Sequence, residues 1–294
     1  MIGMKKIRAS ALLLRVILAL VFVGCLSGCN NLLFYPSKQW RQTPADLNLE
    51  YQDITLSAAD GTRLSAWWLP AQREVKGSVL FLHGNAENIS THIHSVSWLP
   101  AQGYQVLLLD YRGYGHSAGS PSLPEVFSDI EAGLTWLVEA PETQGKPKIV
   151  LGQSLGAAMG GYVIGRSTNL SSAPWREYLD AVILDSGFTG YRAIAREAAA
   201  SHWLTWSLQY PVSLVMPGDY DLLDVVGNIS PVPLLLIHGT QDRVIPYHHV
   251  ETLFAAANNP KSKLRFDGPH IATFNDKENQ QLVLEFLSRV IPEL

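Results

Sequence analysis

Cysteine is nearly absent from this chain of 294 residues. Its two cysteines, Cys25 and Cys29, lie close together at the end of an N-terminal segment, and the rest of the sequence has none. A disulfide therefore cannot cross-link the main part of the chain, which excludes the disulfide-rich scaffolds of small secreted domains. The apolar core has to stabilise the fold, and 47% of the residues are hydrophobic, which suffices for one large domain.

Charge is also scarce in this sequence. Only 16% of the residues are charged, the net charge is −4, and lysine and arginine form no cluster beyond the first fifteen residues. Because a surface that binds nucleic acid needs clustered cations to neutralise phosphates, we expect no nucleic-acid partner. The sequence also lacks a repeat of fixed period and a low-complexity tract, which disfavours solenoids and long disordered arms.

The N-terminal segment has the three parts of a secretory signal. A basic start, MIGMKKIRAS, precedes the apolar run ALLLRVILALVFVG, and small residues follow in CLSGC. The alternative is a retained transmembrane helix. It is less favoured because the apolar run contains Arg15 and is shorter than the roughly 20 residues that span a bilayer.

Residues 26–29, LSGC, resemble the bacterial lipobox, in which the cysteine becomes the lipid-bearing first residue of the mature protein. The resemblance implies that residues 1–28 are a signal peptide, that Cys29 is lipidated, and that residues 29–50 form a tether. We therefore expect a bacterial protein of the cell envelope that a lipid anchor holds on a membrane. Asn30 stands where an aspartate retains some lipoproteins at the inner membrane, which favours the outer membrane, facing the periplasm.

Short runs of apolar and β-branched residues recur from Tyr51 onward and predict strands. The first two runs flank Asp60-Gly61, a hairpin signal, and are expected to be antiparallel. Most later runs are almost wholly apolar, which is typical of parallel strands covered by helices on both faces. The predicted strands are 51–57, 63–69, 78–83, 104–110, 148–152, 181–186, 233–238 and 263–267. This alternation with helical segments predicts a doubly wound α/β fold over residues 51–294, with a mostly parallel eight-stranded sheet.

One long segment interrupts the alternation of strands and helices. It lies between the sixth and seventh predicted strands and carries Trp203, Trp206, Tyr210 and Met216. We expect residues of about 188–230 to form a helical cap over the carboxyl edge of the sheet. The alternative is additional core packing without a functional role.

Two segments match G-x-S-x-G, the pattern that places a nucleophilic serine on a sharp turn between a strand and a helix. They are GHSAG, around Ser117, and GQSLG, around Ser154. Ser154 directly follows the apolar run KIVLG and precedes LGAAMGG, whose small residues allow a helix to approach the sheet. Ser117 is separated from its strand by the glycine-rich YRGYG, and prolines delay the helix that follows. The context favours Ser154 as the nucleophile and predicts a loop at Ser117.

A serine hydroxyl needs a base within hydrogen-bond reach and a carboxylate that orients the base. His270 is the candidate base, because it follows the last predicted strand and a short loop. Asp242 follows the strand before and is the candidate acid, with Asp185 at the end of the sixth strand as the alternative. Asp267 lies on the strand side of the turn that carries His270 and is disfavoured. Six other histidines are expected at surface or packing positions: His92, His94, His116, His202, His248 and His249.

The oxyanion hole of such a site takes one backbone N–H from the residue after the serine and another from a loop after an early strand. Leu155 meets the first requirement, and the bend at Gly84 is expected to turn the backbone amide of Asn85 toward Ser154, with the side chain of Asn85 as a second candidate donor. His83 is expected to fix this loop. The histidines and cysteines do not have metal-ligand spacing, so the sequence predicts neither a metal nor an organic cofactor.

Taken together, LFLHGNAEN, LLLDYRGYGHSAGSPS, GQSLG, YDLLD and HGTQDRVIPYHH resemble the α/β-hydrolase superfamily from about Tyr51 to the end of the chain. Within it they are similar to a membrane-associated group that includes protein acyl-thioesterases. The resemblance implies a serine hydrolase that cleaves carboxylic ester or thioester bonds of a small-molecule or lipid-like substrate. The sequence departs from the usual pattern of this group at Glu87, Ala157 and Pro269, and none of these positions supplies a catalytic atom.

Two other functions remain open at this point. A serine peptidase of the same fold would need acidic groups in the cap to hold a substrate amine, for which Asp219, Asp221 and Asp224 are candidates. A lipoprotein that keeps the fold only for binding is the other alternative. It is disfavoured because each residue type of the triad has a candidate.

Overall fold

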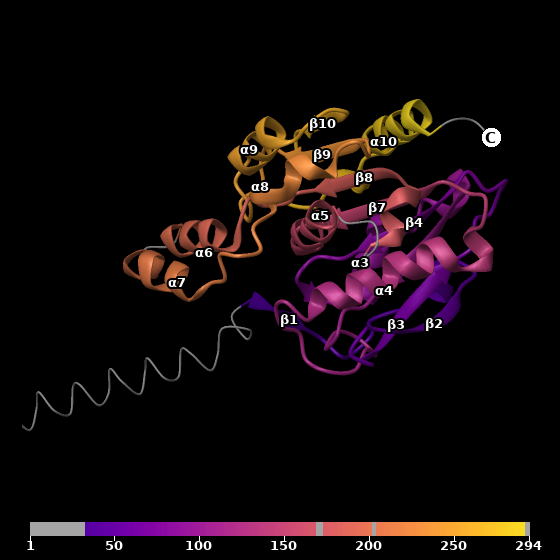
Figure 1. Ribbon diagram of the computed structural model, residues 1–294, viewed down its shortest axis with the longest axis horizontal. Coiled ribbons are helices and arrows are strands. Elements are labelled where there is room, and N and C mark those ends of the chain that lie inside the picture. The colour runs from indigo at the N-terminus through magenta and orange to yellow at the C-terminus, as the bar shows by residue number, and fades with distance from the viewer. Residues whose placement is uncertain (1–32, 169–172, 202–203, 292–294) are drawn as a thin grey trace, which may run out of the picture.

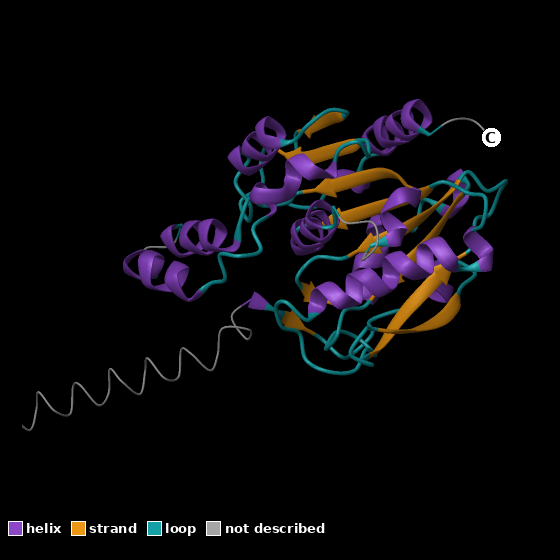
Figure 2. Ribbon diagram, in the orientation of Figure 1, coloured by secondary structure: helices purple, strands orange, loops and turns teal. Residues whose placement is uncertain are grey.

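One eight-stranded sheet organises the chain. The computed structural model describes residues 33–168, 173–201 and 204–291, and Figures 1 and 2 show its sheet between two layers of helices. The strands, in chain order, are β2 (Gln52–Ser57), β3 (Arg63–Leu69), β4 (Gly77–Leu82), β6 (Tyr104–Leu109), β7 (Lys148–Gln153), β8 (Leu179–Asp185), β9 (Leu234–Gly239) and β10 (Lys261–Phe266). Their order across the sheet is β10-β9-β8-β7-β4-β6-β3-β2. The predicted mostly parallel sheet is thus confirmed.

Antiparallel pairing is confined to one side of this sheet. β3 runs antiparallel to both β2 and β6. The other strands pair in parallel, in the order β6, β4, β7, β8, β9 and β10. The β2–β3 hairpin turns at Gly61, which has a φ of 83°, a conformation that glycine adopts without steric strain. The Asp60 carboxylate accepts a hydrogen bond from the Thr62 amide and closes the turn.

Helices cover both faces of the sheet because its strands bury side chains on both sides. On one face, Leu80 and Leu82 of β4 share a core with α4 (Val126–Glu139), α5 (Leu155–Arg166) and α9 (His248–Ala256). On the other face, Val79 and Phe81 share a core with α3 (Ile89–His92) and α10 (Lys277–Val290). Alternate residues of one strand therefore serve opposite cores. The 3₁₀ helices are Pro44–Leu47, Ile93–Ser95, Pro100–Gln102, Pro141–Thr143, Pro174–Tyr178, Trp206–Leu208, Val226–Ile229 and Thr273–Asn275.

A helical insertion follows β8, the sixth strand of the sheet, as predicted. It contains α6 (Tyr191–Ala200), α7 (Gln209–Val215) and α8 (Leu222–Val225). In Figure 1, α6 and α7 project from the body as a pair. α6 buries only Tyr191 and α7 buries no residue, although Ile194, Ala195 and Val212 pack against the core with partly buried side chains. This part therefore adds little to the core, and its functional role stays a prediction. We call residues 191–215 the cap arm; the predicted cap residue Trp203, like His202, lies outside the described residues.

The first described residues pack against the domain. β1 (Tyr35–Pro36) pairs in parallel with β5 (Ala86–Glu87), a two-residue strand in the loop after β4. Phe34 is buried, with 3% of its surface exposed. The end of the segment predicted to be a tether therefore binds the domain.

The predicted signal peptide and Cys29 lie outside the described residues. Within the described part of the chain, none of the helices combines the length and the apolar character that crossing a membrane requires.

Candidate active site

Ser154 occupies the turn between β7 and α5. Its φ of 53° and ψ of −116° are unusual for a residue with a side chain, and such strain occurs where a nucleophile has to project from a sharp turn. The turn is tight enough to require glycine at position 156, since a Cβ there would lie 2.2 Å from the carbonyl oxygen of Leu82. The sequence around Ser154 thus fits the geometry of a nucleophile elbow.

His270 reaches Ser154 from the loop after β10. Its Nε2 lies 3.0 Å from Ser154 Oγ, within hydrogen-bond distance. The imidazole is 16% exposed, so a substrate and water can approach it. Two residues separated by 116 positions in the sequence therefore meet as the sequence predicted.

Asp242 holds the other side of the imidazole. Its Oδ2 lies 2.6 Å from His270 Nδ1, and its Oδ1 accepts hydrogen bonds of 2.8 Å from the amides of Val244 and Ile245. Burial alone would raise the pKa of Asp242, but hydrogen bonds from His238 and His270 outweigh burial and hold the pKa below its usual range. Asp242 is therefore a carboxylate at neutral pH and keeps the Nδ1 proton of His270 in place.

The two other acid candidates bind different groups. Asp185 is fully buried and accepts hydrogen bonds from the side chains of Gln153 and Thr273, as well as from Ser186. Burial raises its pKa, although these hydrogen bonds oppose the rise. Asp267 accepts from Thr240 and Gln241. The geometry thus favours Asp242 as the partner of His270, and Asp185 braces the residue that precedes Ser154.

The loop after β4 lies directly against the serine. A Cβ at Gly84 would lie 3.5 Å from Ser154 Cβ, so the backbone at residue 84 lies close to the serine side chain. Leu155 is the first residue of α5, where backbone N–H groups have no partner within the helix. The site therefore has two segments of backbone from which N–H groups can reach an oxyanion.

The side chain of Asn85 does not point toward the hydroxyl of Ser154, because other groups bind it. Its Oδ1 accepts hydrogen bonds from the Tyr35 amide and the Tyr114 hydroxyl, and its Nδ2 donates to the Leu33 carbonyl. The suggestion that this side chain turns toward Ser154 is therefore wrong, which leaves its backbone amide as the candidate donor. Sequence reasoning missed the contact with residues 33–35, because a two-residue strand has no periodic signal.

His83 fixes the same loop from below, as expected. Its Nδ1 donates to the Gly84 carbonyl, and its own carbonyl accepts from the Tyr111 hydroxyl. Complete burial holds the pKa of His83 well below its ordinary value, so the imidazole is neutral. Its Nε2 lies 3.5 Å from Asp110 Oδ1, and burial raises the pKa of Asp110 to about 7.

Ser117, the serine of the other G-x-S-x-G segment, GHSAG, has a structural role. It is buried, donates to the Asp110 carbonyl at 2.6 Å and accepts from the Ser65 amide at 2.8 Å. Both hydrogen bonds tie the GHSAG loop to the end of β6 and to β3. The loop predicted at Ser117 is present, and its hydroxyl is fully engaged.

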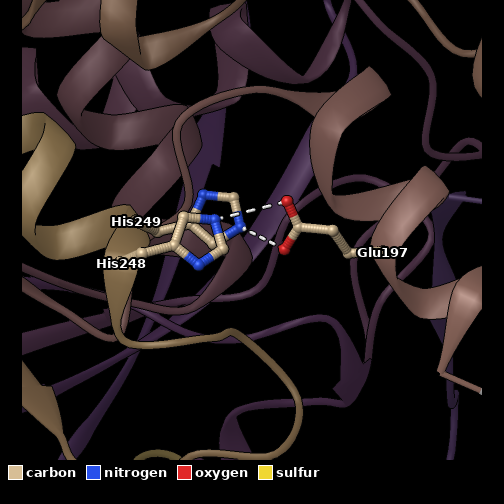
Figure 3. A group of neighbouring side chains, drawn as sticks. All are labelled: Glu197, His248 and His249. Atoms are coloured by element: carbon tan, nitrogen blue, oxygen red, sulfur yellow. Dashed lines mark hydrogen bonds and ion pairs between the residues drawn. The ribbon is translucent and has the colours of Figure 1, made fainter.

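A second polar group lies where the cap arm meets the body (Figure 3). Glu197 of α6 lies 3.3 Å from His248 Nε2 and 3.1 Å from His249 Nε2 at the start of α9. The ligand atoms of these three residues lie within 4.8 Å of one another. However, the Thr189 amide donates to His249 Nδ1, which keeps the imidazole proton on the Nε2 that faces Glu197. This hydrogen-bonded arrangement favours a link between arm and body over a metal site, because a metal at Nε2 would require the proton on Nδ1.

A mostly parallel eight-stranded sheet with a serine on the turn after its central strand, and a histidine and an aspartate after later strands, defines the α/β-hydrolase class. The uncharacterized protein YfhR of Escherichia coli K12 is 34% identical to this chain over 258 residues, which cover 82% of each protein. The α/β hydrolase domain-containing protein WAV2 of Arabidopsis thaliana is 31% identical over 290 residues, or 93% of this chain and 88% of WAV2. The chain therefore belongs to the α/β-hydrolase family that includes YfhR and WAV2.

Two further comparisons agree with this class. A family model described as serine aminopeptidase, S33, matches residues 73–210. The esterase Pf2001 of Pyrococcus furiosus has a TM-score of 0.72 with this chain at 23% identity, over 88% of this chain and 99% of the esterase. The likeness to the esterase supports the α/β-hydrolase fold of this chain.

Proposed function

We propose that this chain hydrolyses carboxylic esters or thioesters with Ser154 as nucleophile, His270 as general base and Asp242 as the orienting acid. The observation that carries the proposal is the continuous relay from Asp242 Oδ2 to His270 Nδ1, at 2.6 Å, and from His270 Nε2 to Ser154 Oγ, at 3.0 Å. These distances suit proton transfer without rearrangement. No organic cofactor or metal takes part in the proposed reaction.

The reaction proceeds through an acyl-enzyme. Ser154 Oγ attacks the carbonyl carbon while His270 Nε2 takes its proton, and the carboxylate of Asp242 stabilises the imidazolium. The backbone amides of Leu155 and Asn85 donate to the oxyanion. His270 then protonates the leaving alkoxide or thiolate. Water attacks the acyl carbon in a second cycle, loses its proton to His270, and releases the carboxylic acid and free Ser154.

The proposed substrates have a fatty or aromatic acyl group and are met at a membrane. Two features support this: the apolar side chains of the cap arm, and the lipobox resemblance at Cys29, by which the enzyme would be lipid-anchored in the cell envelope. Hydrolysis rates for p-nitrophenyl esters with short and long acyl chains test the acyl preference. We expect kcat/KM to rise beyond acetate, and a flat or acetate-only profile would contradict an acyl-binding cap.

A fluorophosphonate probe tests the nucleophile directly, because it reacts with an activated serine hydroxyl whatever the natural substrate. We expect covalent labelling of the full chain and of Ser117→Ala, and loss of labelling in Ser154→Ala. Ser117→Ala is a matched control, since Ser117 lies in the other G-x-S-x-G segment. Labelling that survives in Ser154→Ala, or that is absent from the folded wild type, contradicts the proposal. Absence from the wild type would favour the non-catalytic alternative.

Peptidase activity is the second candidate, favoured by the description of the family model that matches residues 73–210. One of its three candidate amine-binding acids is already engaged, because the Asp221 carboxylate accepts from the Tyr191 amide at the start of α6. Aminoacyl amides separate the two candidates. We expect their hydrolysis to be much slower than that of esters with the same acyl group, and equal or faster hydrolysis would favour the peptidase.

A further inference from the structure

The cap arm exposes large apolar side chains to solvent. Leu208 is 53% exposed, Trp206 62%, Tyr210 65% and Leu214 77%. They occupy the 3₁₀ helix Trp206–Leu208 and α7, of which no residue is buried. Single exposed apolar residues are ordinary, but several on one projecting element mark an interaction surface.

The same part of the chain carries no formal charge. Residues 198–218, AAASHWLTWSLQYPVSLVMPG, contain neither an aspartate, a glutamate, a lysine nor an arginine. The charged residues next to this stretch in the sequence are Glu197, on α6, and Asp219. An exposed protein surface that faces water or a soluble partner normally has charged residues at its rim. A segment without charge can enter an apolar medium without the cost of dehydrating an ion.

The arm departs from the same edge of the sheet at which the described chain begins. Leu33 and Tyr35 are held by the side chain of Asn85, in the loop at the carboxyl end of β4. The arm departs from the carboxyl end of β8, which is the same edge of a parallel sheet. Figure 1 accordingly shows β1, α6 and α7 on one side of the molecule. The described chain therefore begins at the edge of the sheet from which the arm departs.

From this arrangement we propose that the cap arm docks on a lipid bilayer, with Trp206, Leu208, Tyr210 and Leu214 inserted at the level of the headgroups. Tryptophan and tyrosine favour this boundary because one part of each ring system is apolar and the other forms hydrogen bonds. The apolar N-terminal segment and the arm then bind the same membrane surface, and binding of one raises the effective concentration of the other at that surface. The active-site edge of the sheet faces the membrane, where an ester with a long acyl chain resides.

Quenching of tryptophan fluorescence by brominated phosphatidylcholine tests this contact in the full chain. Vesicles of phosphatidylcholine are prepared with and without bromine on the acyl chains, and flotation confirms that the protein is on them. Trp206→Phe isolates the contribution of Trp206, and Trp136→Phe, on α4 in the body, is the matched control. A Leu208→Ser/Leu214→Ser variant changes only exposed side chains and keeps Trp206 as the reporter.

We expect bromine to quench the wild type and Trp136→Phe clearly more than Trp206→Phe. The double serine variant should float but lose most of the additional quenching. If the wild type and Trp206→Phe are quenched alike while both float, the N-terminal segment alone binds the membrane and the proposal is overturned. If Trp206 is shielded from iodide before vesicles are added, residues 1–32 or a second copy cover the arm, and the proposal is overturned as well. Ester turnover is not measured, so these outcomes are independent of the proposed catalytic function.

Discussion

Replacing Asp242 with asparagine tests how the site controls the proton of His270. Asparagine has almost the same size, and its amide oxygen can still accept from the amides of Val244 and Ile245, which lie 2.8 Å from Oδ1. Its NH₂ group would then face the N–H of His270 Nδ1 from the position of Oδ2, so that two donors would meet without an acceptor. The imidazole avoids this conflict by moving its proton to Nε2, the nitrogen that has to accept the proton of Ser154.

The expected loss of activity is large because the substitution removes both the orientation and the charge. In serine triads the exchange of aspartate for asparagine lowers kcat by about 10⁴-fold, which corresponds to about 5.4 kcal/mol in the activation free energy. The free energy of unfolding should change far less, since two of the four hydrogen-bond contacts of Asp242 persist. Initial rates on a p-nitrophenyl ester, with thermal unfolding in parallel, separate the two effects.

Asp185→Asn is the matched control, because Asp185 is the alternative acid, ends β8 and is fully buried. Its partners are Gln153, Thr273 and Ser186, so we expect lower stability and a much smaller loss of kcat. If Asp242→Asn stays within about tenfold of the wild type while folded Asp185→Asn is inactive, the assignment of the acid is wrong.

Three further outcomes follow from buried contacts. Ser117→Ala leaves the Ser65 amide without its acceptor, so it should lower the free energy of unfolding by about 1–3 kcal/mol, measured by urea denaturation, and equal stability would contradict this. Gly156→Ala places a Cβ 2.2 Å from the Leu82 carbonyl oxygen, so it should destabilise the chain by about 1–3 kcal/mol and reduce probe labelling; full labelling at normal Tm would refute the contact. Burial raises the pKa of Asp110 to about 7, so the folded state binds a proton that the unfolded state releases between about pH 4 and 7. Stability from this group is therefore complete below about pH 4 and is lost as the pH rises through 7; Asp110→Asn should flatten that decline of Tm, and an unchanged slope would contradict it.

The sheet could be predicted from sequence because each strand is a short, distinct apolar run. All eight predicted strands overlap those of the structure, including KIVLG before Ser154 and the polar-edged run before His270. Chain order along a doubly wound sheet then brings residues 154, 242 and 270 to one edge, since parallel strands end on the same side. The structure accordingly brings all three side chains within hydrogen-bond distance, while their catalytic roles remain predictions.

Contacts made by very short or exposed elements could not be predicted. The pairing of Tyr35–Pro36 with Ala86–Glu87 joins two residues on each side, too few for a periodic pattern. It redirects the side chain of Asn85, which local reasoning had aimed at the nucleophile. The exposure of the cap arm could not be predicted for another reason, because an apolar sequence indicates that side chains are buried but does not show which surface buries them. Its position away from the core became evident only from the exposure of individual side chains such as Leu214.

The two carboxylate oxygens of Glu197 each contact an imidazole of α9, and this contact joins the cap arm to the segment that follows the candidate acid, Asp242. His248 and His249 begin the helix that directly follows the turn of Asp242, and Ile245 in that turn donates its amide to Asp242. A rotation of α6 away from α9 has to break both contacts of Glu197 or pull on the segment that holds the acid. Fewer than ten residues of backbone therefore separate the contact of the arm with α9 from the candidate acid, so substitutions at Glu197 are expected to affect both.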